Sequence, residues 1–166
     1  MRLCFVVQRY GAEVAGGAEA LCGQFAERLA ARGHTVSVLT TCARDYDTWE
    51  DFYDPGTSDL NGVRVERLAV SAPREPARLR TPPRGRRTRC TERRAEPCAV
   101  RRLDARTGAE PRGFADRLRQ VAAEVDVVVF FTYLYATTSI GVAAVSGLVP
   151  TLLHPTAHEE WPLRLP

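Results

Sequence analysis

Residues 1–41, MRLCFVVQRYGAEVAGGAEALCGQFAERLAARGHTVSVLTT, contain the pattern that decides the fold. Residues 3–7 form a short, wholly apolar run, which is typical of a central strand in a parallel sheet. After a polar loop, apolar residues recur at helical spacing and predict a helix with one stripe packed on the sheet: Ala18, Leu21, Cys22, Phe25, Ala26 and Leu29. Gly33 is a natural end for this helix. Residues 35–40, TVSVLT, then predict a second strand, so the stretch is a βαβ unit with a right-handed crossover.

The rest of the chain repeats this alternation of strands and helices. The expected elements are a surface loop over 41–60, a turn at Asn61-Gly62, a strand over 63–70, a helix over 114–125, a strand over 127–131, a loop over 132–138, a helix over 139–146 and a strand over 148–153. This order predicts a single α/β domain over residues 1–166. We expect an open, mostly parallel Rossmann-like sheet with helices on both faces, interrupted by an irregular Arg/Pro-rich segment.

Residues 127–153 carry no charged side chain, which permits two interpretations. The stretch is long enough to cross a bilayer as one helix. Its Thr, Ser, Gly and Pro residues divide it into two β-rich runs around a small-residue helix, and a buried strand–helix–strand unit also lacks charge because parallel strands are covered on both faces. The second interpretation is favoured. The amino-terminal apolar run ends at Gln8 and is too short for a signal peptide, so we expect a cytoplasmic protein.

The charge of the chain is concentrated in one segment. The whole sequence has 23 basic and 20 acidic residues, and this net charge of +3 is too small to imply a nucleic-acid or membrane partner. Residues 73–113 hold thirteen Arg against five acids, so this segment carries +8 and the remainder −5. The segment also has six Pro and no Phe, Trp, Tyr or Ile. It cannot bury enough apolar surface to offset its ordering entropy, and we expect it to be disordered or irregular.

The five cysteines do not form a metal or disulfide pattern. There is no C-x-x-C pair and no histidine at zinc-finger spacing, and an odd number of cysteines favours reduced thiols. We therefore expect no metal site at the cysteines, and we also expect no cofactor.

A candidate site lies where three loops follow strands, at residues 8–17, 132–138 and 154–160, because ligands of such sheets bind outside the carboxyl ends of the strands. Gly16 and Gly17 begin the first helix, where free N–H groups and the helix dipole suit an anion. The loop lacks the Lys and Ser/Thr of a Walker motif, and the chain has no G-x-G-x-x-G. The alternative is that the two glycines only permit a tight turn, and the residues alone leave both explanations open.

Several segments resemble the family 4 glycosyltransferases, whose GT-B fold has two facing Rossmann-like domains. The resemblance is carried by the apolar first strand, GGAE at 16–19 and the junction LAARGHTVSVLT at 29–40, with NGVRVERLAV at 61–70, VDVVVFFTYLY at 125–135 and PTAHEE at 155–160 in support. It implies the acceptor-side domain of an enzyme that moves a sugar from a nucleotide-sugar donor to a sugar or lipid acceptor, with retention of configuration and usually without a metal. A lipid acceptor would bring the protein to the inner face of the membrane.

The resemblance also assigns residues. It implies that His158 is catalytic, facing the reacting sugar, with Glu159 beside it, and that Gly16 and Gly17 lie against substrate phosphate or acceptor. A histidine there could donate to a sugar hydroxyl or to charge that develops as the glycosidic bond breaks. We expect the diglycine loop and the segment bearing His158 to share one cleft.

Further residues near these loops are candidates with alternatives. Thr132 and Tyr133 follow a strand and could contact an acceptor, as could Tyr135, although aromatic residues there are as often packing residues. His154 is a rival for the position of His158.

The chain departs from the family in two ways. The donor domain that grips the nucleotide diphosphate is absent from these 166 residues, so we expect a truncated protein with no glycosyl transfer of its own. Where relatives continue with helical sequence, this chain has the Arg/Pro-rich segment, and we hypothesise a GC-rich gene read out of frame for roughly 40 codons. Translation of the other two frames across the segment tests this hypothesis.

Two other function classes remain open from the residues. The Arg/Pro-rich segment, residues 73–113, could be a basic arm that binds RNA, DNA or acidic lipid. It lacks the interleaved aromatic residues of a single-strand binder. We therefore expect no obligatory nucleic-acid partner. The domain could also be a Rossmann-like nucleotide-binding module without transfer chemistry, because fold alone does not settle function. The oligomeric state is not set by the sequence.

Overall fold

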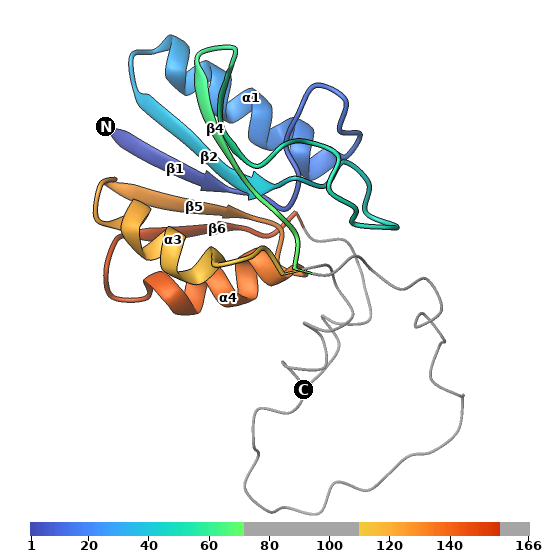
Figure 1. The fold of residues 1–166 in the computed structure, drawn as a ribbon. Coiled ribbons are helices and arrows are strands. Elements are labelled where there is room, and N and C mark those ends of the chain that lie inside the picture. Colours follow the sequence, from blue (N-terminus) through green and yellow to red (C-terminus); the bar gives the residue numbers. More distant parts are fainter. Residues whose placement is uncertain (72–109, 157–166) are drawn as a thin grey trace, which may run out of the picture.

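The computed structural model describes residues 1–71 and 110–156, which form one six-stranded sheet with helices on both faces (Figure 1). The strand order is β3-β4-β2-β1-β5-β6. The elements are β1 (Arg2–Val6), α1 (Gly17–Ala31), β2 (Thr35–Thr41), β3 (Gly56–Leu60), β4 (Val63–Leu68), α3 (Phe114–Ala122), β5 (Val127–Phe131), α4 (Ala136–Val145) and β6 (Thr151–His154). All neighbouring strands are parallel except β3 and β4. The predicted open, mostly parallel α/β sheet is therefore confirmed.

The central strand β1 supplies side chains to two separate cores because successive residues of a strand point to opposite faces. Leu3 and Phe5 pack into the core beneath α1. Cys4 and Val6 pack into the other core, where Phe114 and Leu118 of α3 join them. Both faces of β1 are thus covered, which explains its uninterrupted apolar sequence.

Helix α1 packs on the sheet most deeply through the smaller residues of its apolar stripe. Cys22 and Ala26 are fully buried, whereas the Phe25 side chain is 45% exposed. The ring of Phe25 lies at the side of the contact, with its centroid 6.4 Å from that of Phe131. The predicted apolar stripe is confirmed, because Leu21 and Leu29 pack against the same core as Cys22 and Ala26, while the larger ring of Phe25 is only partly covered.

The connection between β2 and β4 is not only a surface loop, as the sequence predicts for residues 41–60. Its last five residues form β3, which pairs antiparallel with β4. Asn61 and Gly62 have φ values of 54° and 78°, as the two central residues of a tight hairpin turn require. Trp49, within the same connection, is only 1% exposed. The turn was predicted correctly. The edge strand β3 was not predicted because its sequence, GTSDL, is polar and has no apolar pattern.

The Arg/Pro-rich segment begins and ends at one place in the fold. Residues 72–109 lie outside the described residues, so most of the predicted irregular segment is not tested. Its flanks form an isolated antiparallel bridge between Val70 and Pro111. The N–H of Ser71 donates to the carbonyl of Glu110 at 2.9 Å, and the N–H of Arg112 donates to that of Ala69 at 2.8 Å. Residues 110–113, the last four of the predicted segment, are among the described residues, and two of them take part in these contacts at their main chain, Glu110 and Arg112.

The charge-free stretch forms β5, α4 and β6, as the favoured interpretation predicted. Helix α4 begins at Ala136, so the predicted loop over 132–138 is three residues shorter, and β6 begins only at Thr151. Within residues 1–71 and 110–156, no helix has the length and apolar character needed to cross a membrane.

Candidate functional site

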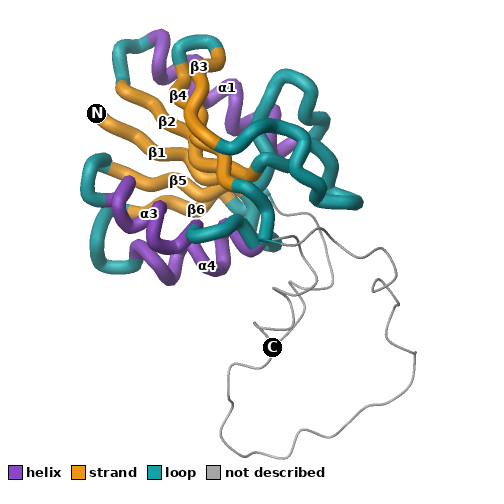
Figure 2. Tube along the Cα trace, viewed as in Figure 1, coloured by secondary structure: helices purple, strands orange, loops and turns teal. Residues whose placement is uncertain are grey.

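The candidate site lies at the carboxyl edge of the sheet, where long connections gather (Figure 2). The chain passes from β1 to β2 on one side, and β5 lies on the other side of β1. This reversal of strand order makes the crevice outside β1 and β5 the preferred position for a ligand in an open α/β sheet. Gln8 follows β1 and Thr132 follows β5, and the Thr132 hydroxyl donates to Gln8 Oε1 at 3.2 Å. One side-chain hydrogen bond therefore spans the switch point.

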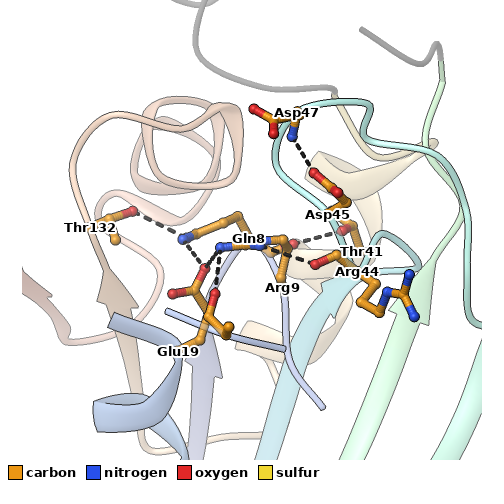
Figure 3. Close-up of polar contacts among 9 residues, drawn as sticks. Gln8, Arg9, Glu19, Thr41, Arg44, Asp45, Asp47 and Thr132 are labelled. Atoms are coloured by element: carbon orange, nitrogen blue, oxygen red, sulfur yellow. Dashed lines mark hydrogen bonds and ion pairs between the residues drawn. The ribbon is translucent and has the colours of Figure 1, made fainter. Parts of the chain in front are cut away.

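Gln8 also connects this edge to the start of α1 (Figure 3). Its Nε2 donates to Glu19 Oε1 at 2.9 Å. The same oxygen accepts from Arg9 Nη2 at 2.5 Å. The Arg9 and Glu19 side chains are only 6% and 4% exposed, so this is a buried ion pair. Gln8, Arg9 and Glu19 together form the cluster at this edge. Arg9 Nη1 also donates to the Arg44 carbonyl at 3.0 Å, which links the connection after β2 to the cluster.

The charges of Arg9 and Glu19 cancel within the cluster. A buried charge without a partner is strongly destabilising, and each of these residues satisfies the other. Glu19 lies in the first turn of α1, where a carboxylate also interacts favourably with the positive end of the helix dipole. The amino terminus of α1 therefore already has an anion supplied by the protein itself.

Gly16 and Gly17, predicted as substrate-binding residues, have different environments. A Cβ atom at Gly16 would collide with the Glu19 carboxylate and displace it from its contacts with Gln8 and Arg9, so internal packing favours glycine there. A Cβ atom at Gly17 would meet nothing within 4 Å, and this residue is exposed. The tight-turn explanation accounts for Gly16. Only Gly17 leaves the helix start open to a molecule outside the protein.

Thr132, also predicted as substrate-binding, has a left-handed backbone with φ of 69° and is 7% exposed. This conformation is uncommon for residues other than glycine, and it persists where neighbouring groups fix it. The N–H of Thr132 donates to the His154 carbonyl at 2.9 Å. Its carbonyl accepts from the Thr138 hydroxyl at 2.8 Å. With the bond to Gln8, three hydrogen bonds hold this strained residue in place.

The aromatic candidates divide between packing and exposed positions. The ring of Tyr135 packs against Trp49, with centroids 5.5 Å apart, so Tyr135 has a packing role. Tyr133 lies half-buried between Thr132 and the start of α4. The exposed His154 stacks on Phe131, with ring centroids 5.5 Å apart and planes 15° apart.

His158 and Glu159 lie outside the described residues, so their predicted roles are untested. The strand that precedes them is described. β6 ends at His154, whose carbonyl accepts a hydrogen bond from the N–H of Thr132. The hydroxyl of Thr132 in turn donates a hydrogen bond to Gln8. The segment that carries His158 therefore starts from the same sheet edge as the diglycine loop.

Sequence analysis missed the centre of the cluster, which is Gln8, Arg9 and Glu19. Two signals could have found it. A Gln-Arg pair directly follows a buried strand, and Glu19 occupies the third position of the helix after two glycines. Polar residues placed so close to a central strand end must find partners, because an unpartnered buried polar group is costly.

The cysteines of the described part take no role in this cluster. Burial raises the pKa of the Cys4 thiol to about 12 and that of Cys42 to about 11, which leaves both protonated and unreactive at neutral pH. Nor do the described residues contain a group of three or more His, Cys, Asp or Glu that could hold a metal ion.

The sequence matches no protein-family model, and no curated protein matches it significantly.

Proposed function

We propose that this chain is the acceptor-side domain of a retaining glycosyltransferase, which moves a sugar from a nucleotide-sugar donor to a sugar or lipid acceptor. The acceptor would bind outside the carboxyl ends of β1 and β5. The observation that supports this most directly is the strained Thr132, joined to Gln8 across the switch point. Backbone strain fixed by several hydrogen bonds is concentrated at ligand-binding positions.

The cluster suits an uncharged, hydroxyl-rich ligand better than a free phosphate. Arg9 is already neutralised by Glu19, and a further anion at the start of α1 would lie close to that carboxylate. Gln8 and Thr132 are buried and act as positioning residues, since they are 2% and 7% exposed. Gly17 and His154 are exposed, and we expect the main chain of Gly17 and the ring of His154 to contact the acceptor.

The resemblance supplies the remaining roles. His158 is proposed as the catalytic residue that donates to the reacting sugar, with Glu159 in the binding site. The donor half of a GT-B enzyme is a second Rossmann-like domain, and the described residues hold one sheet. We therefore expect the 166-residue protein to release no nucleotide from UDP-, GDP- or ADP-sugars. Turnover by homogeneous protein would contradict this expectation.

Binding tests the proposal without the donor domain. The ¹⁵N-labelled protein would be titrated with a panel of monosaccharides, sugar phosphates, nucleotides, nucleotide sugars and short DNA and RNA strands while amide shifts are recorded. We expect a sugar to shift the amides of Gly17, Ala18 and Thr132. Gly17→Ala should weaken this binding because its methyl group enters the open space before the helix. Gly23→Ala is the matched control, because a Cβ there makes only ordinary contacts with Tyr10, at 3.9 Å.

The same titration distinguishes the alternatives. If no compound of the panel shifts the amides at this edge, the glycosyltransferase proposal fails. If only a nucleotide shifts them, the domain is a nucleotide-binding module without an acceptor site. If DNA or RNA shifts only resonances of residues 72–109, and its affinity falls steeply with salt, the basic-arm function is supported instead.

A further inference from the structure

The two edges of the sheet have different chemistry. The β3 edge, GTSDL, is polar and carries Asp59, as protected edges do. The β6 edge, TLLH, lies in a stretch without any Asp, Glu, Lys or Arg from residue 127 to residue 155. Two of the large apolar residues exposed in the described part, Leu152 and Leu153, belong to β6, and the exposed Leu148 precedes the strand. The half-exposed ring of Phe25 lies near the end of β6, with its centroid 6.4 Å from that of His154. The β6 edge is therefore an uncharged, apolar surface.

The hydrogen bonds to β5 show which main-chain groups of β6 are free to pair. Val128 N–H donates to the carbonyl of Pro150, and Thr132 N–H donates to that of His154. Main-chain groups of successive strand residues point alternately to the two sides. Thr151 and Leu153 consequently direct their N–H and C=O groups away from the sheet.

The leucines of β6 extend the apolar surface to both faces. Leu152 pairs with Val129, on the face covered by α1, and is 61% exposed. Leu153 pairs with Phe130, on the face covered by α3 and α4, and is 49% exposed. A strand added at β6 would thus cover main-chain groups and apolar side chains together.

We propose that a second copy of this chain pairs with β6 through its own β6, antiparallel and about a two-fold axis perpendicular to the sheet. Thr151 of each copy lies opposite Leu153 of the other, which allows four main-chain hydrogen bonds. Leu152 lies opposite its own copy at the axis. The absence of charge along this stretch removes the repulsion that self-pairing otherwise brings. This inference is independent of the proposed function.

The register with Leu152 at the axis uses only residues of β6. If Leu153 lay opposite itself, Thr151 would face Pro155, which lies beyond β6 and has no N–H, so each of these outer pairs would form at most one hydrogen bond instead of two. The two-fold arrangement also uses up the β6 edge of both copies, so association stops at two. The edges that remain free are the polar β3 strands.

Light scattering after size exclusion tests the proposal across a range of concentrations. We expect the mass to rise from 18.4 kDa to twice that value. Leu152→Lys places two like charges at the axis and removes the two leucines that the dimer would bury there. It should weaken the dimer roughly 100-fold. Thr57→Lys adds the same charge to an exposed residue of the β3 edge and should leave the dimer unchanged.

Hydrogen exchange of the wild-type protein gives a second readout that needs no variant. The amides of Thr151 and Leu153 should become protected as the protein concentration rises, while those of β3 should not. A mass of 18.4 kDa at all concentrations, growth beyond the dimer, or a dimer in which these two amides still exchange freely would each overturn the proposal.

Discussion

Glu19→Gln tests whether the buried ion pair fixes the carboxyl edge. The substitution keeps the shape of the side chain and one oxygen acceptor but removes the negative charge beside Arg9. The Arg9 guanidinium would keep its bond to the Arg44 carbonyl and remain buried without a counter-charge. Removing one partner of a buried pair costs about 3–5 kcal/mol. We expect about 3 kcal/mol, because the glutamine oxygen still accepts a hydrogen bond.

The measurement is urea unfolding followed by circular dichroism. With a slope of about 1.5 kcal/mol per M, the midpoint should fall by about 2 M, with the slope itself unchanged. Asp116→Asn is the matched control because it removes the same kind of charge from a pair with Arg119. That pair is exposed, and its loss should cost at most about 0.5 kcal/mol.

The double variant Arg9→Met/Glu19→Gln separates the pair from the individual residues. With no charge left inside the cluster, it should lose less stability than the two single variants added together. A Glu19→Gln protein as stable as the control would refute the view that this pair holds the strand ends together.

The other predictions concern the start of α1, residues 72–109 and the effect of pH on stability. Gly16→Ala should destabilise the protein by about 1–3 kcal/mol in urea unfolding, because its methyl group displaces the Glu19 carboxylate; equal stability would contradict this. Replacing residues 72–109 by a short Gly-Ser linker should leave the far-UV circular dichroism signal of the helices and strands, and the midpoint of thermal unfolding, close to those of the wild type. Loss of the cooperative unfolding transition would contradict this prediction. Hydrogen bonds from the Arg2 main chain and side chain lower the pKa of Asp126, so its contribution to stability is present above about pH 4 and is lost as the pH falls. Asp126→Asn should therefore be less stable than wild type in urea unfolding at pH 7, and the two proteins should be equally stable near pH 2. A difference in stability that does not change with pH would show that the charge of Asp126 is not its cause.

The parts of the fold that follow from hydrophobic periodicity were predictable. β1 and β2 were predicted to within one residue at each end because both are continuously apolar and buried. β3 was not predicted, since an edge strand exposed to solvent has no apolar pattern. The stripe of α1 was predicted correctly, but a periodic pattern does not show how deeply each of its side chains is buried, and Phe25 is 45% exposed.

The candidate site was predictable in position but not in composition. The rule that ligands bind at carboxyl strand ends located Thr132 and the diglycine loop correctly at one edge. The two sequence signals, Gln8-Arg9 after a buried strand and Glu19 at the start of a helix, mark candidate residues but do not show that they contact one another, because that depends on how the residues after β1 turn toward α1. The different roles of Gly16 and Gly17 likewise became visible only once the Glu19 carboxylate was placed.

The bridge between Val70 and Pro111 joins the two points of the fold between which residues 72–109 are inserted in the sequence. The flanking strand and helix are thereby held in place by contacts that involve none of the intervening codons. A lineage could alter the length, the composition or even the reading frame of that insertion and still inherit an intact sheet.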